Sequence, residues 1–321
     1  MPLRPNPINT TLPGADLQLF LEERRIPFRL GEEIAPYTSM RVGGCVAIAA
    51  LIDSRDQLIE LGRKALGENL PFVLIGGGSN TVFCDGYSPI LVLVNRGGAP
   101  PVRRGDEIHV DSGVPLKSLL AWCAANGAGG LEFLAGIPGT AGGAAAVNAG
   151  AFGRDMAGIL IGATILDGNG EIRRITPGDF SFAYRTSRFK DGREIIVDLA
   201  LAVETRHASS IQADIRANLE RRTSRHPAWN QMTAGCFFKN PGRGPHRRSA
   251  GKIIAESGLQ GKRYGDIVIS EHHANFLVNL GNAAFKEIQA VERDIVGTVK
   301  RRLGITLERE VVYISSTGDK Y

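Results

Sequence analysis

Three consecutive glycines at 76–78 follow an apolar run at 72–75 and restrict most strongly what this chain can fold into. Glycines in series let the backbone approach a phosphate closely, with several N–H groups turned toward it. In a Rossmann dinucleotide-binding fold, such a loop continues directly into a helix. Here Ser79 and Asn80, which add side-chain donors, lead into a second apolar run at 81–83. We therefore predict a loop that joins strand to strand, which argues against a Rossmann fold.

A second glycine-rich segment spans residues 136–143 and continues in small residues to Gly150. Small residues let a backbone lie flat against a ring system, and Thr140 can cap a helix whose N-terminus faces negative charge. A tight turn without any ligand explains either glycine segment equally well when it is taken alone. Two such segments within one region of mixed helix and strand favour a dinucleotide site.

The periodicity of the apolar residues predicts a mixed α and β chain with more than one domain. With 321 residues, of which 43% are hydrophobic, the chain is long enough for two or three domains. Helical periodicity is found at 15–26, 55–66, 116–127, 210–226, 249–258 and 285–304. Short runs rich in β-branched residues predict strands, among them 71–77, 89–94, 107–113, 163–168, 171–177, 194–204, 275–280 and 307–315. We place a domain boundary at about 206, where a long charged helix begins.

Several classes of protein are disfavoured by what the sequence lacks. No stretch approaches the roughly 18 apolar residues of a membrane span, and the first ten residues do not resemble a secretion signal. We therefore expect a cytoplasmic protein. The cysteines are scattered without metal-binding spacing, which predicts reduced thiols and no structural metal. They are Cys45, Cys84, Cys123 and Cys236.

The positive charge is concentrated in one part of the chain. Residues 206–263 contain twelve Lys or Arg against three Asp or Glu, although the net charge of the whole chain is only +5. A solvated basic face and a nucleic acid surface are both conceivable for such a window. Few aromatic residues lie between the basic ones, which favours a pocket for a diphosphate over a nucleic acid surface.

Four further motifs accompany the glycine segments in a fixed order. They are Arg41-Val42-Gly43-Gly44, Tyr184-Arg185, Gly235-Cys236-Phe237-Phe238-Lys239-Asn240-Pro241 and Glu310-Val311. Together the motifs resemble the UDP-N-acetylenolpyruvoylglucosamine reductases (the MurB family), from about residue 20 to 315. The stretch from Lys190 to Arg206 leaves no room for the extra loop of one subgroup, so the chain resembles the shorter, second type.

The resemblance implies an α+β fold with a FAD-binding domain of the vanillyl-alcohol oxidase (PCMH) type. That domain consists of two α+β subdomains and is followed by a C-terminal α+β substrate-binding domain. We expect an N-terminal segment at 1–20, a FAD-binding domain at 21–205 and the C-terminal domain at 206–321. The two subdomains are expected at about 21–97 and 98–205.

The resemblance also implies a reaction, the NADPH-dependent and FAD-mediated reduction of UDP-N-acetylglucosamine enolpyruvate to UDP-N-acetylmuramate. This step belongs to peptidoglycan precursor synthesis and thus to cell shape and cell division. FAD is expected to be bound and NADPH to donate hydride, with no nucleic acid or membrane partner and a monomeric chain. A FAD-dependent sugar or alcohol oxidase and a non-catalytic UDP-sugar-binding module stay open as alternatives.

An enol ether is electron-rich, so its carboxylate must take up charge when hydride arrives. Arg185 suits this role because a guanidinium holds a carboxylate through two parallel hydrogen bonds. A surface salt bridge is the alternative for Arg185. Glu310, if protonated, can donate to the developing enolate oxygen. Glu308 lies two positions earlier on the same predicted strand face, but Glu310 matches the family motif.

Cys236 departs from the family pattern, which has serine at this position. A thiol is a competent general acid near neutral pH, so the exchange keeps the role of proton donor. An ordinary small buried cysteine is the alternative. Arg185, Cys236 and Glu310 are thus the expected catalytic residues.

The expected binding residues fall into two groups. Those for FAD are Arg41, Gly43, Gly76, Gly77, Gly78, Ser79, Asn80, Gly136, Ile137, Pro138, Gly139, Thr140, Gly143 and Ile196. Those for the substrate are Tyr184, Arg222, Arg225, Lys239, Asn240 and Lys252. His226 stands before Pro227, where glutamine is expected in the family, so the contact made at that position is left open.

Overall fold

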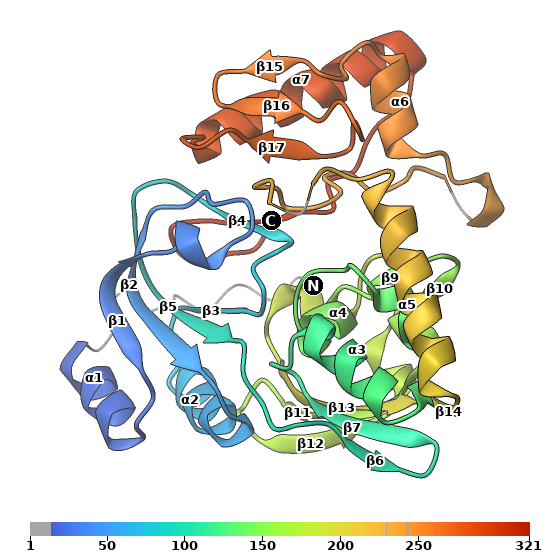
Figure 1. The fold of residues 1–321 in the computed structure, drawn as a ribbon. Coiled ribbons are helices and arrows are strands. Elements are labelled where there is room, and N and C mark those ends of the chain that lie inside the picture. The colour runs from blue at the N-terminus through green and yellow to red at the C-terminus, as the bar shows by residue number, and fades with distance from the viewer. Residues whose placement is uncertain (1–13, 229, 243) are drawn as a thin grey trace, which may run out of the picture. The chain divides into compact units, whose positions relative to one another are not determined.

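The computed structural model describes residues 14–228, 230–242 and 244–321, which form two compact units. Unit 1 contains the described residues up to 32 together with 46–77 and 89–220, and unit 2 contains 33–45, 78–88 and 221–321. Both units mix helices and strands, so the predicted α+β class is confirmed (Figure 1). Each unit is assembled from three stretches of sequence, unlike the continuous ranges expected for the domains.

The first half of unit 1 is a four-stranded sheet with two helices (Figure 1). In sheet order, the strands are β1 (Phe28–Glu33), β2 (Cys45–Ile52), β5 (Tyr87–Asn95) and β3 (Phe72–Ile75), and the helices are α1 (Gly14–Glu23) and α2 (Arg55–Gly67). β3 and β5 are parallel, with Ile75 opposite Val94. Both strands therefore end at the same edge of the sheet, from which the glycine loop at 76–78 departs.

The second half of unit 1 is a five-stranded antiparallel sheet. In sheet order, its strands are β12 (Ile172–Ile175), β11 (Leu160–Leu166), β13 (Ile195–Ala202), β7 (Glu107–Asp111) and β6 (Val102–Arg104). Along β11, Ile165 packs in the core with α3 (Leu116–Ala125) and α4 (Ala141–Ala146), whereas Leu166 packs in the core with α2. This alternation is expected of a strand covered on both faces.

Gly62 allows helix α2 to pack closely against that second sheet. A Cβ at position 62 would lie 2.7 Å from Cδ1 of Leu166 and 3.0 Å from Cδ1 of Ile195. A larger residue would therefore push α2 away from the sheet. Two small antiparallel pairs complete unit 1, β8 (Ala128–Gly129) with β14 (Glu204–Thr205) and β9 (Gly150–Ala151) with β10 (Arg154–Asp155).

Unit 2 is built around one long helix, α7 (Phe285–Leu303). Phe285, Ile288, Ile295 and Val299 recur at helical spacing and are buried, which gives α7 one apolar face. The other elements are α6 (Ala250–Glu256), the antiparallel strands β15 (Arg263–Tyr264), β16 (Ile267–Ile269) and β17 (Leu277–Asn279), and the parallel pair β4 (Thr81–Phe83) and β18 (Val312–Ile314). Helix α5 (Ala208–Thr223) belongs to unit 1 up to Glu220, and its last three residues belong to unit 2.

The structure confirms most predicted elements and corrects one that matters for the site. All six predicted helices are present, with ends that differ by up to three residues. The predicted strand at 307–315 is wrong over its first half, because β18 covers only 312–314. Among the described residues, no helix is long and apolar enough to cross a membrane. In the same part of the chain, no group of three His, Cys, Asp or Glu residues could hold a metal ion.

Candidate active site

The two glycine segments contact each other in unit 1. A Cβ on Gly76 would lie 2.3 Å from Oγ1 of Thr140, and a Cβ on Gly77 would lie 2.7 Å from Cα of Gly139. Contacts this short are not compatible with any side chain, so glycine is required at both positions. The predicted connection from strand to strand is confirmed, because the loop joins β3 to β4. The structure thus packs Gly76 and Gly77 directly against Thr140 and Gly139.

Arg96, which the sequence analysis did not select, holds the first of these segments. Its Nε donates to the backbone oxygen of Gly76 at 3.0 Å, and its Nη2 donates to that of Gly77 at 3.4 Å. In a trans peptide the N–H points opposite to the C=O. The N–H groups that follow these two carbonyls therefore point away from Arg96. The sequence does contain a signal for this role. Arg96 is the basic residue that directly follows β5, the strand that pairs with β3.

Thr140 caps helix α4, as the sequence predicted. Its side chain accepts a hydrogen bond from the backbone N–H of Gly143, and its φ and ψ are extended. Gly136 and Gly139 both have positive φ, so the segment turns sharply before the helix begins. Ile196, expected to contact the cofactor, lies on β13 and is only 5% exposed, inside the core that includes α4.

Arg185 occupies the tip of a tight turn in unit 1. Ala183 and Thr186 are bridged by two backbone hydrogen bonds, so Tyr184 and Arg185 are the central residues of the turn. Arg185 has a φ of +57°, a conformation that a type II turn requires at its third position and that favours glycine. Its guanidinium carbon lies 5.6 Å from the centroid of the Tyr184 ring. A strained arginine at a turn tip suggests selection for function.

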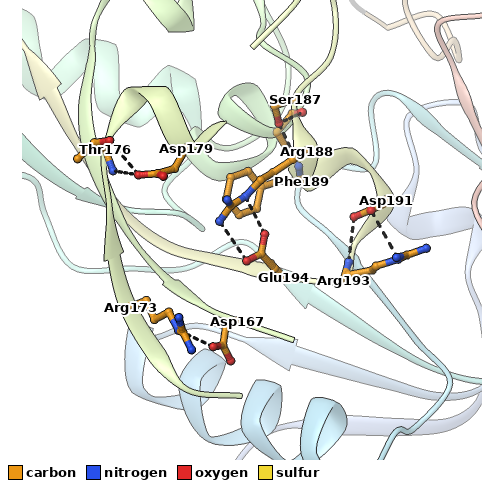
Figure 2. A network of polar contacts seen from close by, with 11 residues as sticks. Asp167, Arg173, Thr176, Asp179, Ser187, Arg188, Phe189, Asp191, Arg193 and Glu194 are labelled. Atoms are coloured by element: carbon orange, nitrogen blue, oxygen red, sulfur yellow. Dashed lines mark hydrogen bonds and ion pairs between the residues drawn. The ribbon is translucent and has the colours of Figure 1, made fainter. Parts of the chain in front are cut away.

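The segment after this turn is tied into unit 1 by polar contacts, shown in Figure 2. Arg188 and Glu194 form a two-pronged ion pair, with Nε to Oε2 at 2.8 Å and Nη2 to Oε1 at 3.1 Å. Ser187 caps the short 3-10 helix at Arg188–Asp191 and also donates to the backbone oxygen of Ala146 at 2.7 Å. The residues that follow Arg185 are therefore held at both ends.

Cys236 and Glu310 are brought close together in unit 2. Cys236 is bridged to Phe276, and the next residue, Phe237, accepts the backbone N–H of Glu310 at 2.9 Å. The backbone oxygen of Glu310 accepts from Nδ2 of Asn80 at 3.4 Å. Gly235 has positive φ, and a Cβ there would lie 3.9 Å from the backbone oxygen of Ser79. Asn80, Cys236 and Glu310 thus lie close together in unit 2, whereas Arg185 is part of unit 1.

Glu308 and Glu310 have different surroundings, although the sequence placed both on one strand face. Both precede β18 and flank Arg309, which forms an isolated antiparallel bridge with Phe238. The Glu308 side chain is 73% exposed and pairs with Lys239, whose side chain is 17% exposed. Glu310 is half-buried beside Phe237. The pairing also means that the charge of Lys239, an expected substrate binder, is balanced by Glu308.

The remaining expected substrate binders lie in two places of unit 2. Arg222 is in the last turn of α5, and Arg225 follows in the bend that leads to His226. Asn240 accepts the backbone N–H of Ala250 at 2.9 Å, so its side chain supports the start of α6. Lys252 is exposed on α6.

His226 lies in an aromatic cluster that the sequence did not reveal. Its ring centroid is 5.5 Å from that of His273 and 5.0 Å from that of Phe276, the residue bridged to Cys236. Burial, with the charges of Arg222 and Arg225 and the neighbouring His273, lowers the pKa of His226 to about 4. His226 is therefore neutral near pH 7.

The motif at 41–44 contributes to unit 2. Arg41 has a φ of +57°, and its Nη1 donates to the backbone oxygen of Pro36 at 2.7 Å. A Cβ on Gly43 would lie 2.7 Å from Cγ2 of Ile34 and 2.8 Å from Cβ of Phe83, so only glycine fits. Gly78 is constrained in the same way, because a Cβ there would lie 2.3 Å from the backbone oxygen of Tyr37.

Two known families match consecutive parts of this chain. The FAD binding domain matches residues 46–176, and the C-terminal domain of UDP-N-acetylenolpyruvoylglucosamine reductase matches residues 226–314. A relative from Symbiobacterium thermophilum, UDP-N-acetylenolpyruvoylglucosamine reductase 2, is 36% identical over 88% of this chain and 91% of its own length. The UDP-N-acetylenolpyruvoylglucosamine reductase of Syntrophus aciditrophicus is 37% identical over 89% of this chain and 92% of its own length. A crystal structure of UDP-N-acetylenolpyruvylglucosamine reductase from Thermus caldophilus has a TM-score of 0.73 at 31% identity, covering 90% of this chain and 98% of that one.

Proposed function

This chain belongs to the UDP-N-acetylenolpyruvoylglucosamine reductase family, and we propose from that premise that it uses bound FAD and NADPH to reduce UDP-N-acetylglucosamine enolpyruvate. The product is UDP-N-acetylmuramate, a precursor of peptidoglycan. The fold has the FAD-binding domain of the PCMH type and the C-terminal domain of the reductase family. The chain is therefore an oxidoreductase and a flavoprotein.

One observation carries the proposal further than the family match does. Gly76 and Gly77 pack against Thr140 and Gly139, with no room for a Cβ at either of the two consecutive glycines. A loop without side chains suits a cofactor that combines a diphosphate with a flat ring system, because its backbone N–H groups can reach the phosphates without steric hindrance. The residues present thus fit FAD, which would be held by these segments and by the capped start of α4.

FAD, when bound, supplies the relay by which hydride from NADPH reaches the substrate. The chain's own residues would prepare the substrate for that hydride. Arg185 would hold the enolpyruvyl carboxylate and stabilise the negative charge that develops on it. Cys236 would give its thiol proton to the carbon next to that carboxylate. Glu310 would donate a hydrogen bond to the enolate oxygen while it is protonated.

The other assignments follow the same reasoning. Residues 21–205 would form the FAD-binding domain and residues 206–321 the substrate domain, where Arg222, Arg225, Lys239, Asn240 and Lys252 would hold the diphosphate and sugar. Tyr184 would contact the substrate beside Arg185. A role in cell shape and division, a cytoplasmic location and a monomeric state complete the proposal.

A single titration tests the function. The purified protein is expected to be yellow, to lose flavin absorbance at about 450 nm on adding NADPH without oxygen, and to regain it only on adding the UDP-enolpyruvyl sugar. Return of colour on exposure to air alone, at a catalytic rate, would indicate an oxidase. A colourless protein that binds the UDP-sugar and leaves NADPH untouched would contradict the proposal in favour of a binding module.

A further inference from the structure

We propose that Asn148 and Ser187, here called the Arg185 clamp, are positioning residues that hold Arg185 in its strained turn for the reaction. The inference rests on the proposed function, because it assigns the clamp a role through Arg185. Neither residue is among the catalytic or binding residues expected from the sequence. Both lie within unit 1, as does the turn.

Asn148 holds the start of the turn. Its Nδ2 donates to the backbone oxygen of Ala183 at 3.1 Å, and its Oδ1 accepts the backbone N–H of Ala157 at 3.0 Å. The residue is only 4% exposed. Both ends of this buried amide are thus bonded to the backbone, which orients it firmly, since losing either bond would leave a polar atom of a buried side chain unsatisfied.

Ser187 holds the end of the turn. Its Oγ donates to the backbone oxygen of Ala146 at 2.7 Å and accepts the backbone N–H of Phe189 at 3.3 Å, and the residue is 6% exposed. The hydroxyl therefore links the last residue of α4 to the 3-10 helix through one donated and one accepted hydrogen bond. Figure 2 shows Ser187 beside Arg188, whose ion pair with Glu194 fixes the same segment from the other side.

The clamp brackets the residue whose conformation most needs support. Arg185 has a φ of +57°, which is unfavourable for a residue with a side chain relative to its preferred conformations. Such a conformation persists only if the surrounding contacts determine it. Ala183 lies two positions before Arg185, and Ser187 lies two positions after it. Both are hydrogen-bonded to residues at or just beyond the end of α4.

Helix α4 relates this turn to the glycine segments. It begins at the cap Thr140, whose Oγ1 fills the space beside Gly76, and ends just before Asn148. The six residues of α4 therefore connect the segment proposed to hold FAD with the clamp. A short helix fixed at both ends sets a constant spacing, so the clamp would keep Arg185 at a defined position with respect to the cofactor segment.

The test uses Asn148→Gly in the complete protein. Asn148 itself has a φ of +45°, so glycine keeps the backbone conformation and removes only the side-chain bonds. We expect unchanged FAD affinity, measured by flavin fluorescence, and an unchanged rate of flavin reduction by NADPH. The rate at which the UDP-enolpyruvyl sugar reoxidises the reduced protein should fall by about 10- to 100-fold, because misplaced catalytic groups lose that much.

A double-mutant cycle distinguishes positioning from a general structural role. In an Arg185→Ala background, Asn148→Gly should have no further effect on the reoxidation rate, because the group that it positions is already gone. Equal losses in the presence and absence of Arg185 would overturn the proposal. Ser187→Ala should behave like Asn148→Gly, and Ser187→Thr, which keeps the hydroxyl, should recover most of the rate.

Arg25→Gly is the matched control, because Arg25 is exposed in unit 1 with a φ of +53°. It should match the unsubstituted protein in every step. An active unsubstituted protein whose Asn148→Gly variant is equally fast would refute the clamp and leave the proposed function intact. If the unsubstituted protein itself is not reoxidised by the UDP-enolpyruvyl sugar, the proposed function fails.

Discussion

The guanidinium of Arg96 donates to the backbone oxygen of Gly76 at 3.0 Å, so an arginine at the end of β5 orients the loop that leaves β3. Gly77 is held by the same side chain. Because peptide N–H groups point opposite to their carbonyls, this contact selects which face of the loop presents donors. An exposed side chain thus determines the direction of a backbone site.

Replacing Arg96 should therefore weaken FAD binding. We expect Arg96→Ala to raise the dissociation constant of FAD about 10-fold, corresponding to the loss of one charge-assisted hydrogen bond, and Arg96→Lys to have a smaller effect. The measurement is titration of the apoprotein with FAD, followed by the quenching of flavin fluorescence. Arg104→Ala, at an exposed position of β6, serves as the control. Equal FAD affinity of all variants would rule out this role for Arg96.

Cys236 can be tested by separating the two halves of the reaction. Cys236→Ala should be reduced by NADPH at the normal rate but should form UDP-N-acetylmuramate at least 100-fold more slowly, because the proton donor is lost. Cys236→Ser should retain substantial turnover. Cys84, half-buried in the same unit, provides the control Cys84→Ala. Normal product formation by Cys236→Ala would show that another group supplies the proton.

The two glutamates near the C-terminus should respond differently to the same change. Glu310→Gln should reduce turnover by about 100-fold or more, because an amide N–H is a weaker hydrogen-bond donor to a developing oxyanion than a carboxylic acid O–H. Glu308→Gln removes only the exposed partner of Lys239, and exposed ion pairs contribute about 0–1 kcal/mol. We expect its turnover to change by less than about 5-fold. The opposite ranking in steady-state assays would exchange the two assignments.

His226 makes stability depend on pH. Burial and the nearby Arg222 keep the pKa of His226 at about 4 in the folded protein, below the reference value of 6.5. At a pH between these two pKa values, the unfolded chain binds more protons than the folded protein. The free energy of unfolding therefore falls as the pH drops from 6.5 toward 4. Titration of one group can change the free energy of unfolding by at most about 1.4 kcal/mol per pH unit.

The variant His226→Gln tests this dependence. It should lose less stability than the unsubstituted protein between pH 7 and pH 5, as measured by urea unfolding at the two pH values. His207→Gln, at an exposed position just before α5, is the control for loss of a histidine outside the aromatic cluster. An identical pH dependence in His226→Gln and the unsubstituted protein would mean that other groups account for it.

The elements of the fold could be predicted from local sequence because their causes are local. The strand-to-strand loop at 76–80 follows from glycines flanked by apolar runs, and the cap at Thr140 follows from one side chain and a backbone three residues away. The apolar period of α7 likewise specified a helix with one buried face. The strand predicted at 307–315 is too long for a physical reason, since alternation of residue types does not reveal how far the pairing with a partner strand extends.

What the sequence alone determined was the set of elements, the family and the residue types available for chemistry. Tertiary structure decided which of those residues meet. Arg96 reaches Gly76 across 20 positions, Asn148 reaches Ala183 across 35, and Asn80 reaches Glu310 across 230. Such contacts depend on the packing of sheets and helices around a shared core, and no local pattern encodes that packing. The glycine segments illustrate both levels, because their composition allowed a close approach and the fold supplied the partner for each.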